Sequence, residues 1–79
     1  RERGIQMRNV LRGARKMLEL TQEKMAERIG ISAIYYQKIE EGERTGSFKI
    51  WDKLEDITGI HQRILRENED NYPFQADNQ

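Results

Sequence analysis

The feature that most constrains this chain is Gly30, which separates two short segments with helical spacing. Before it, Met25 and Ile29 are four residues apart, so they share one face of a helix. Glycine adopts positive φ without steric cost, and Gly30 can therefore end that helix and reverse the chain. Ser32 then supplies a good N-cap for a second helix. Because the turn is so short, we expect the two helices to cross steeply, leaving one face of the second helix free.

Residues 22–41 resemble the helix-turn-helix of the phage-repressor family (Cro/CI-type, or XRE). The family pattern requires apolar, small and glycine residues at fixed places, and these are filled by Met25, Ala26, Ile29, Gly30, Ile31, Tyr36 and Ile39. Tyr36 departs from the β-branched aliphatic residue that is usual there. The flanks also match, through Leu20-Thr21-Gln22 and Ile39-Glu40-x-Gly42, and the likeness covers roughly residues 10–64. It implies an all-α, compact five-helix lambda-repressor-like domain whose helices 2 and 3 form the helix-turn-helix.

Composition narrows the possible classes of function. The 79 residues allow one small domain, and a hydrophobic content of 35% permits one modest core. Cysteine is absent, which fits a reducing, cytoplasmic setting and leaves no thiolate metal site. No apolar run approaches the ~20 residues of a membrane span, and no signal peptide is recognised. We expect no cofactor, no metal at the lone His61 and no enzymatic activity, since no catalytic grouping is evident.

The formal net charge of zero hides an uneven distribution. Six basic side chains and one acidic side chain lie within residues 1–18, whereas acidic residues outnumber basic ones in residues 19–46 and 47–79. A neutral chain of this kind can still present a basic face to nucleic acid.

The expected organisation is one domain over residues 7–67. Met7 suits a native start, so residues 1–6 are either a cloning remnant or an N-terminal extension, and the polar, acidic residues 68–79 are expected to form a flexible tail. Apolar spacing and capping residues predict helices at about 5–18, 22–29, 32–41, from Ser47 to Thr58-Gly59, and 61–67. Thr21 and Ser47 are the expected N-caps of the second and fourth helices.

The resemblance assigns candidate DNA contacts by position. In this family helix 3 enters the major groove. The candidate base contacts are therefore Ser32, Ala33, Ile34, Tyr35, Gln37 and Lys38. Gln37 can pair with adenine and Lys38 can reach guanine or a phosphate, whereas Ile34 offers only apolar contact, for example to a thymine methyl. The candidate phosphate contacts are Gln22, Arg44, Thr45, Ser47, Lys49 and Arg12, with Arg8 as a further candidate from the first helix.

Other residues have expected structural roles. Arg15 and Glu40 match the pair that ties helix 1 to helix 3 in this family, so they are expected to form a structural ion pair. Trp51, Phe48 and Tyr36 are expected in the core because aromatic side chains bury large areas.

The prediction is a sequence-specific DNA-binding transcriptional regulator, of repressor type as the family resemblance implies, with double-stranded DNA as partner and a homodimer as the binding species. The alternative is a protein-interaction module, or an antitoxin-type regulatory partner, that retains the fold. Neutral charge, Glu41, Glu43 and the apolar tip at residues 33–35 favour that alternative.

Overall fold

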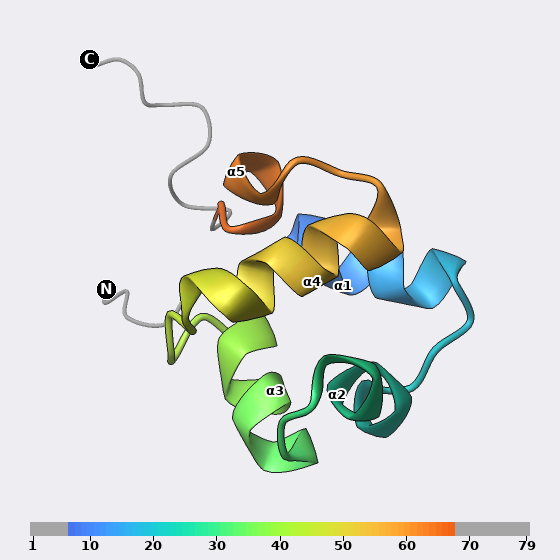
Figure 1. Cartoon of the computed structure of the whole chain (residues 1–79), viewed down its shortest axis with the longest axis vertical. Coiled ribbons are helices and arrows are strands. Elements are labelled where there is room, and N and C mark those ends of the chain that lie inside the picture. Colours follow the sequence, from blue (N-terminus) through green and yellow to red (C-terminus); the bar gives the residue numbers. More distant parts are fainter. Residues whose placement is uncertain (1–6, 68–79) are drawn as a thin grey trace.

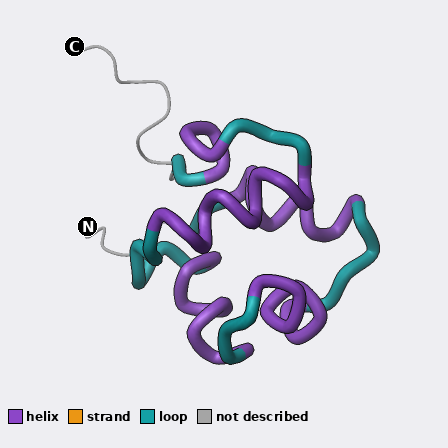
Figure 2. The backbone as a smooth tube through the Cα atoms, viewed as in Figure 1, coloured by secondary structure: helices purple, strands orange, loops and turns teal. Residues whose placement is uncertain are grey.

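The computed structural model describes residues 7–67, which contain five helices and no strand. The helices are α1 (Asn9–Met17), α2 (Gln22–Ile29), α3 (Ala33–Glu40), α4 (Phe48–Thr58) and α5 (Gln62–Leu65). Figures 1 and 2 show α2 and α3 together at the lower end, with α4 crossing above them and α5 at the opposite end. The all-helical architecture predicted from the sequence is confirmed. None of the helices in residues 7–67 is long and apolar enough to cross a membrane.

Three hydroxyl side chains cap the N-termini of α2, α3 and α4 at the positions predicted from the sequence. Those of Thr21, Ser32 and Ser47 accept hydrogen bonds from the backbone N–H three residues further on, at 3.0, 3.1 and 3.4 Å. Gly30 ends α2 with a φ of 79°, in the left-handed region that favours glycine. The α2–turn–α3 unit is therefore set by local chemistry at its two boundaries.

One apolar core joins all five helices. Its buried residues are Leu11, Met25, Ala26, Ile29, Tyr36, Ile39, Ile50, Trp51, Leu54 and Leu65. Trp51 and Tyr36 are buried as predicted, but the placement of Phe48 in the core was wrong, because its side chain is 75% exposed. Phe48 is the first residue of α4, beyond the edge of the core. Met17, at the end of α1, is likewise 84% exposed.

The predicted start of the first helix was also wrong. α1 begins at Asn9 instead of about residue 5, and Met7 and Arg8 precede it (residues 1–6 lie outside the described range). The backbone N–H of Arg8 donates to the carbonyl of Glu40 at 2.9 Å, so this residue is tied to the end of α3.

The fifth helix is shorter than the predicted 61–67 and ends at Leu65. His61 is its N-cap, with Nδ1 accepting from the N–H of Arg63 at 3.0 Å. Leu65 is buried in the core, whereas Ile64 is 45% exposed. The expected tail, with Tyr72 and Phe74, lies outside the described residues.

Candidate nucleic-acid interface

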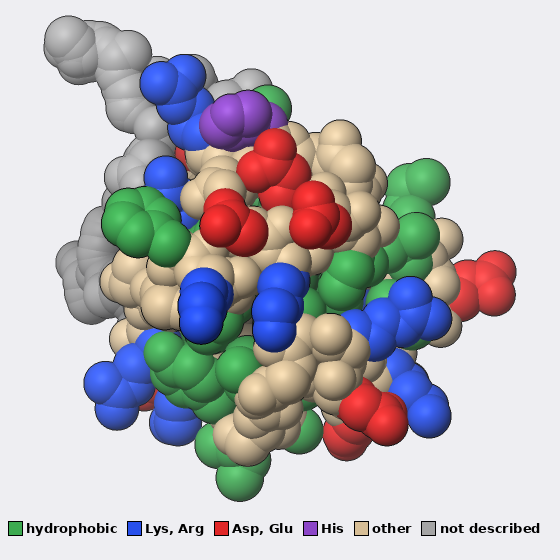
Figure 3. Space-filling view, in the orientation of Figure 1, with side chains coloured by type: hydrophobic (Ala, Val, Ile, Leu, Met, Phe, Trp, Pro, Cys, Tyr) green, Lys and Arg blue, Asp and Glu red, His purple; other side chains and the backbone are tan. Residues whose placement is uncertain are grey.

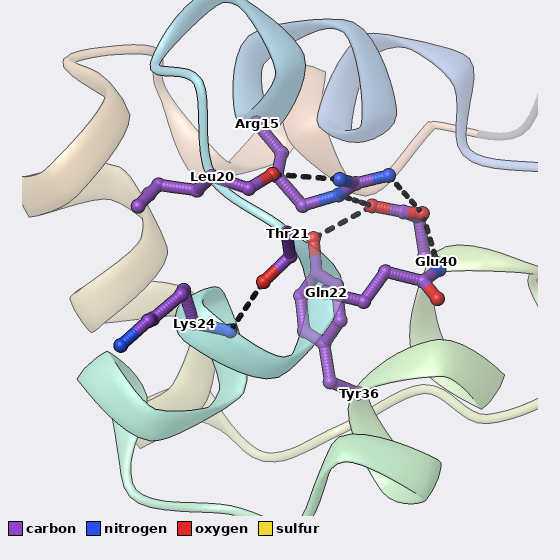
Figure 4. Close-up of polar contacts among 7 residues, drawn as sticks. All are labelled: Arg15, Leu20, Thr21, Gln22, Lys24, Tyr36 and Glu40. Atoms are coloured by element: carbon purple, nitrogen blue, oxygen red, sulfur yellow. Dashed lines mark hydrogen bonds and ion pairs between the residues drawn. The ribbon is translucent and has the colours of Figure 1, made fainter.

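A buried carboxylate fixes the orientation of α3 (Figure 4). Glu40, the last residue of α3, is 1% exposed. It accepts two hydrogen bonds from Arg15 of α1, at 2.8 and 3.2 Å. Gln22 of α2 and the Tyr36 hydroxyl each donate to it at 2.8 Å. The expected Arg15–Glu40 pair is present, and the carboxylate connects three helices.

These contacts keep the pair ionised. Burial alone raises the pKa of Glu40, but hydrogen bonds from Arg15, Tyr36 and Gln22 outweigh it, and the net pKa lies below the usual value. The hydrogen bond to Glu40 raises the pKa of Arg15. Burial, followed by the adjacent Glu40 charge, raises the pKa of Tyr36, whose hydroxyl therefore stays a donor. A tyrosine in place of the family's usual aliphatic residue thus supplies one more donor to the carboxylate.

The outer face of α3 is open. Ile34 is 68% exposed, and Ser32 and Gln37 are also exposed, whereas Ala33 and Tyr35 pack partly against the core. Figure 1 shows the N-terminal end of α3 directed away from α4, at the lower edge of the molecule. The structure therefore places an exposed apolar side chain on the predicted reading surface.

Two polar side chains of this face contact neighbouring carboxylates. The Gln37 amide donates to Glu41 at 3.1 Å, and Lys38 Nζ lies 3.3 Å from a carboxylate oxygen of Glu43. Both contacts are solvent-exposed. Exposed contacts of this kind, whether hydrogen bond or ion pair, contribute little free energy, so Gln37 and Lys38 can exchange them for contacts with a ligand.

The loop between α3 and α4 is held from both sides. The N–H groups of Glu43 and Arg44 donate to the Lys38 carbonyl at 2.8 and 3.2 Å. The Trp51 indole N–H donates to the Thr45 carbonyl at 2.7 Å. Arg44, Thr45, Ser47 and Lys49 are all exposed around the start of α4, as is Arg12 on α1. The loop therefore presents its predicted phosphate-binding side chains on a fixed backbone.

Arg8 also holds this loop in place, and its prediction as a phosphate contact was wrong. It is 7% exposed, so it is no candidate for phosphate contact. Its guanidinium donates to the carbonyls of Ile39, Arg44 and Arg66 at 2.6, 2.9 and 2.9 Å. It also lies 5.3 Å from the centre of the Trp51 ring, within cation–π range.

A cation at the end of α3 also complements the helix dipole, although burial and then the Arg66 charge lower the pKa of Arg8. The partners of Arg8 are backbone carbonyls far away in the chain, and no local sequence signal points to them.

Charged side chains divide the surface. In Figure 3, acidic side chains gather over α4 and α5, and a row of basic side chains separates them from the end formed by α2 and α3.

Gln22 is less available for phosphate than predicted, since it is partly buried and its amide already donates to Glu40. Within residues 7–67, no group of three or more His, Cys, Asp or Glu side chains is placed to hold a metal ion.

Together, the steeply crossed α2 and α3, the short Gly30 turn and the open face of α3 define a helix-turn-helix domain. A family model, HTH_3 (helix-turn-helix), matches residues 11–61, which is more than half of the chain. The protein belongs to this family of XRE-type domains, which includes the lambda repressor and Cro and consists of DNA-binding transcription regulators. A search of curated proteins found no match.

Proposed function

We propose that this protein is a sequence-specific, repressor-like regulator of transcription that inserts α3 into the major groove of double-stranded DNA. The observation that carries the proposal is the combination of an open outer face with the buried Glu40 contacts on the inner face of the same helix. A reading helix must be held at a fixed angle, because base contacts depend on register.

The roles proposed for α3 follow from exposure. Ile34, which is 68% exposed, contacts a thymine methyl, while Gln37 reads adenine and Lys38 reads guanine or binds phosphate. Ser32, Ala33 and Tyr35 line the start of the helix and make shorter contacts with base edges. With so few hydrogen-bonding groups, shape and bound water contribute much of the selectivity.

The residues on either side of α3 are proposed to bind the DNA backbone. Arg44, Thr45, Ser47 and Lys49 bind phosphates on one side of α3. Arg12 binds a phosphate from α1, and Gln22 binds one from the start of α2 through the amide N–H that Glu40 does not use. Because one domain covers about half an operator, we further propose a homodimer on two half-sites one helical turn apart.

The decisive experiment is a DNA titration at two salt concentrations, with the operator first selected from a random pool. Three cations, those of Arg12, Arg44 and Lys49, would displace about three counterions per domain. Raising salt from about 50 to 200 mM should then weaken binding about fortyfold per domain. Absence of binding at the lower salt concentration would refute the proposal and favour a protein-interaction module.

Two substitutions separate base reading from phosphate binding. Gln37→Ala should weaken binding to the selected operator and leave random DNA unaffected, whereas Arg44→Ala should weaken both alike. Glu43→Gln is a complementary test, because it releases Lys38 and removes a negative charge near the phosphates. It should tighten binding, and weaker binding would show that the carboxylate has another role.

A further inference from the structure

An open pocket of about 350 Å³ lies beside the loop that precedes α4. It is lined by Thr45, Gly46, Ser47, Phe48, Trp51 and Arg66. Its lining is mostly apolar, with the buried Trp51 on one side and the 75% exposed Phe48 on another. Figure 3 shows an exposed hydrophobic side chain beside basic ones at the left edge, near the start of α4. An aromatic group with an acidic neighbourhood would suit this surface.

The chain itself supplies such a group close by. Arg66 lines the pocket, and the segment 68–79 follows one residue later. This segment contains Tyr72 and Phe74, on either side of Pro73, and no other Phe, Trp or Tyr follows Trp51. Five or six extended residues span up to about 20 Å, so the rings can reach a pocket whose rim is at Arg66. Pro73 also restricts the backbone between the rings, which lowers the entropy lost on docking.

Charge favours the same occupant. The segment 68–79 carries three acidic residues, Glu69, Asp70 and Asp77, and no lysine or arginine. The pocket contains Arg66, and its lining loop is flanked in sequence by the exposed Arg44 and Lys49. Aromatic and electrostatic complementarity therefore coincide at one end of α4.

We propose that residues 68–79 dock on their own domain, with the ring of Tyr72 or Phe74 in this pocket. The acidic side chains of the same segment then lie near Arg44 and Lys49. The consequence, which rests on the proposed function, is competition with DNA, because those cations and Thr45 and Ser47 are the proposed phosphate contacts. The segment then lowers DNA affinity by occupying the phosphate site. A segment docked about nine-tenths of the time would lower the apparent affinity about tenfold.

Docking is tested directly by paramagnetic broadening in the full chain. The chain has no cysteine, so Ala76→Cys gives one attachment point for a spin label. We expect selective broadening of the Gly46 and Phe48 amides and of the Trp51 indole N–H. Adding Tyr72→Ser and Phe74→Ser should abolish it, whereas the flanking control Asn71→Ser with Gln75→Ser should retain it. Equal broadening in both variants, or none in either, would overturn the proposal.

Two further measurements keep the parts of the proposal distinct. Mixing spin-labelled chains with isotope-labelled, unmodified chains should give no broadening at the pocket, and broadening there would assign the pocket to a second copy instead. On selected DNA, Tyr72→Ser with Phe74→Ser should bind about tenfold more tightly than the unmodified chain. Unchanged affinity after loss of docking would overturn the competition, while docking in a chain that binds no DNA would overturn only the proposed function.

Discussion

Replacing Glu40 with alanine tests the central structural argument, because it removes a carboxylate that accepts four hydrogen bonds. The Arg15 side chain, only 10% exposed, would keep its charge without a carboxylate partner. Breaking a buried pair from one side costs about 3–5 kcal/mol. Some 60 ordered residues give a total stability of roughly 3–9 kcal/mol. Glu40→Ala should therefore remove about a third or more of the free energy of unfolding.

The measurement is urea unfolding at pH 7, followed by far-ultraviolet circular dichroism. The matched control is Lys24→Ala, which removes an ion pair of similar type at 3.8 Å in which both side chains are more than two-thirds exposed. That change should cost less than about 0.5 kcal/mol. A cost below about 1 kcal/mol for Glu40→Ala, with an unchanged dependence on urea, would refute the view that this carboxylate orients α3.

Three more predictions concern stability. The pKa of Glu40 is lower in the folded state, so its contribution to the free energy of unfolding should be complete above the usual pKa of about 4.3 and be lost as pH falls through the folded value. Glu40→Gln should flatten this acid dependence in unfolding titrations. Arg8→Met should cost about 2–3 kcal/mol in urea unfolding, since it leaves buried carbonyls without their donor, while the exposed Arg12→Met should stay within about 0.5 kcal/mol. Gly13→Ala should raise the free energy of unfolding by about 0.5–1 kcal/mol, because residue 13 lies inside α1 with open space for a Cβ. Gly46→Ala should lower it, because residue 46 has a φ of 83° and an added Cβ would lie 3.2 Å from a core atom.

The parts of the fold that could be predicted are those with local causes. Thr21, Ser32 and Ser47 start helices through bonds to a backbone N–H three residues away, and Gly30 ends one through its own conformation. Such signals are contained within a few residues of sequence. They were sufficient to predict α2 and its turn into α3.

The features that could not be predicted depend on distant residues. Arg8 is buried because carbonyls 31, 36 and 58 residues away converge on its guanidinium. Phe48 has the same helical spacing to Trp51 as a core residue would have, yet the core ends before the first turn of α4. The Arg15–Glu40 pair was anticipated through family resemblance, whereas the contribution of Tyr36 to it required the geometry of three helices.

The buried and exposed faces of α3 consist of different residues, so they can change independently in evolution. Tyr36, Ile39 and Glu40 point inward and hold the domain together, while Ile34 and Gln37 point outward and touch none of the core. Substitutions on the outer face should change stability little and independently of those on the inner face. On the proposed DNA-reading role of α3, a duplicated copy of this gene could therefore acquire a different preferred DNA sequence through one or two substitutions on the outer face while the domain stays folded.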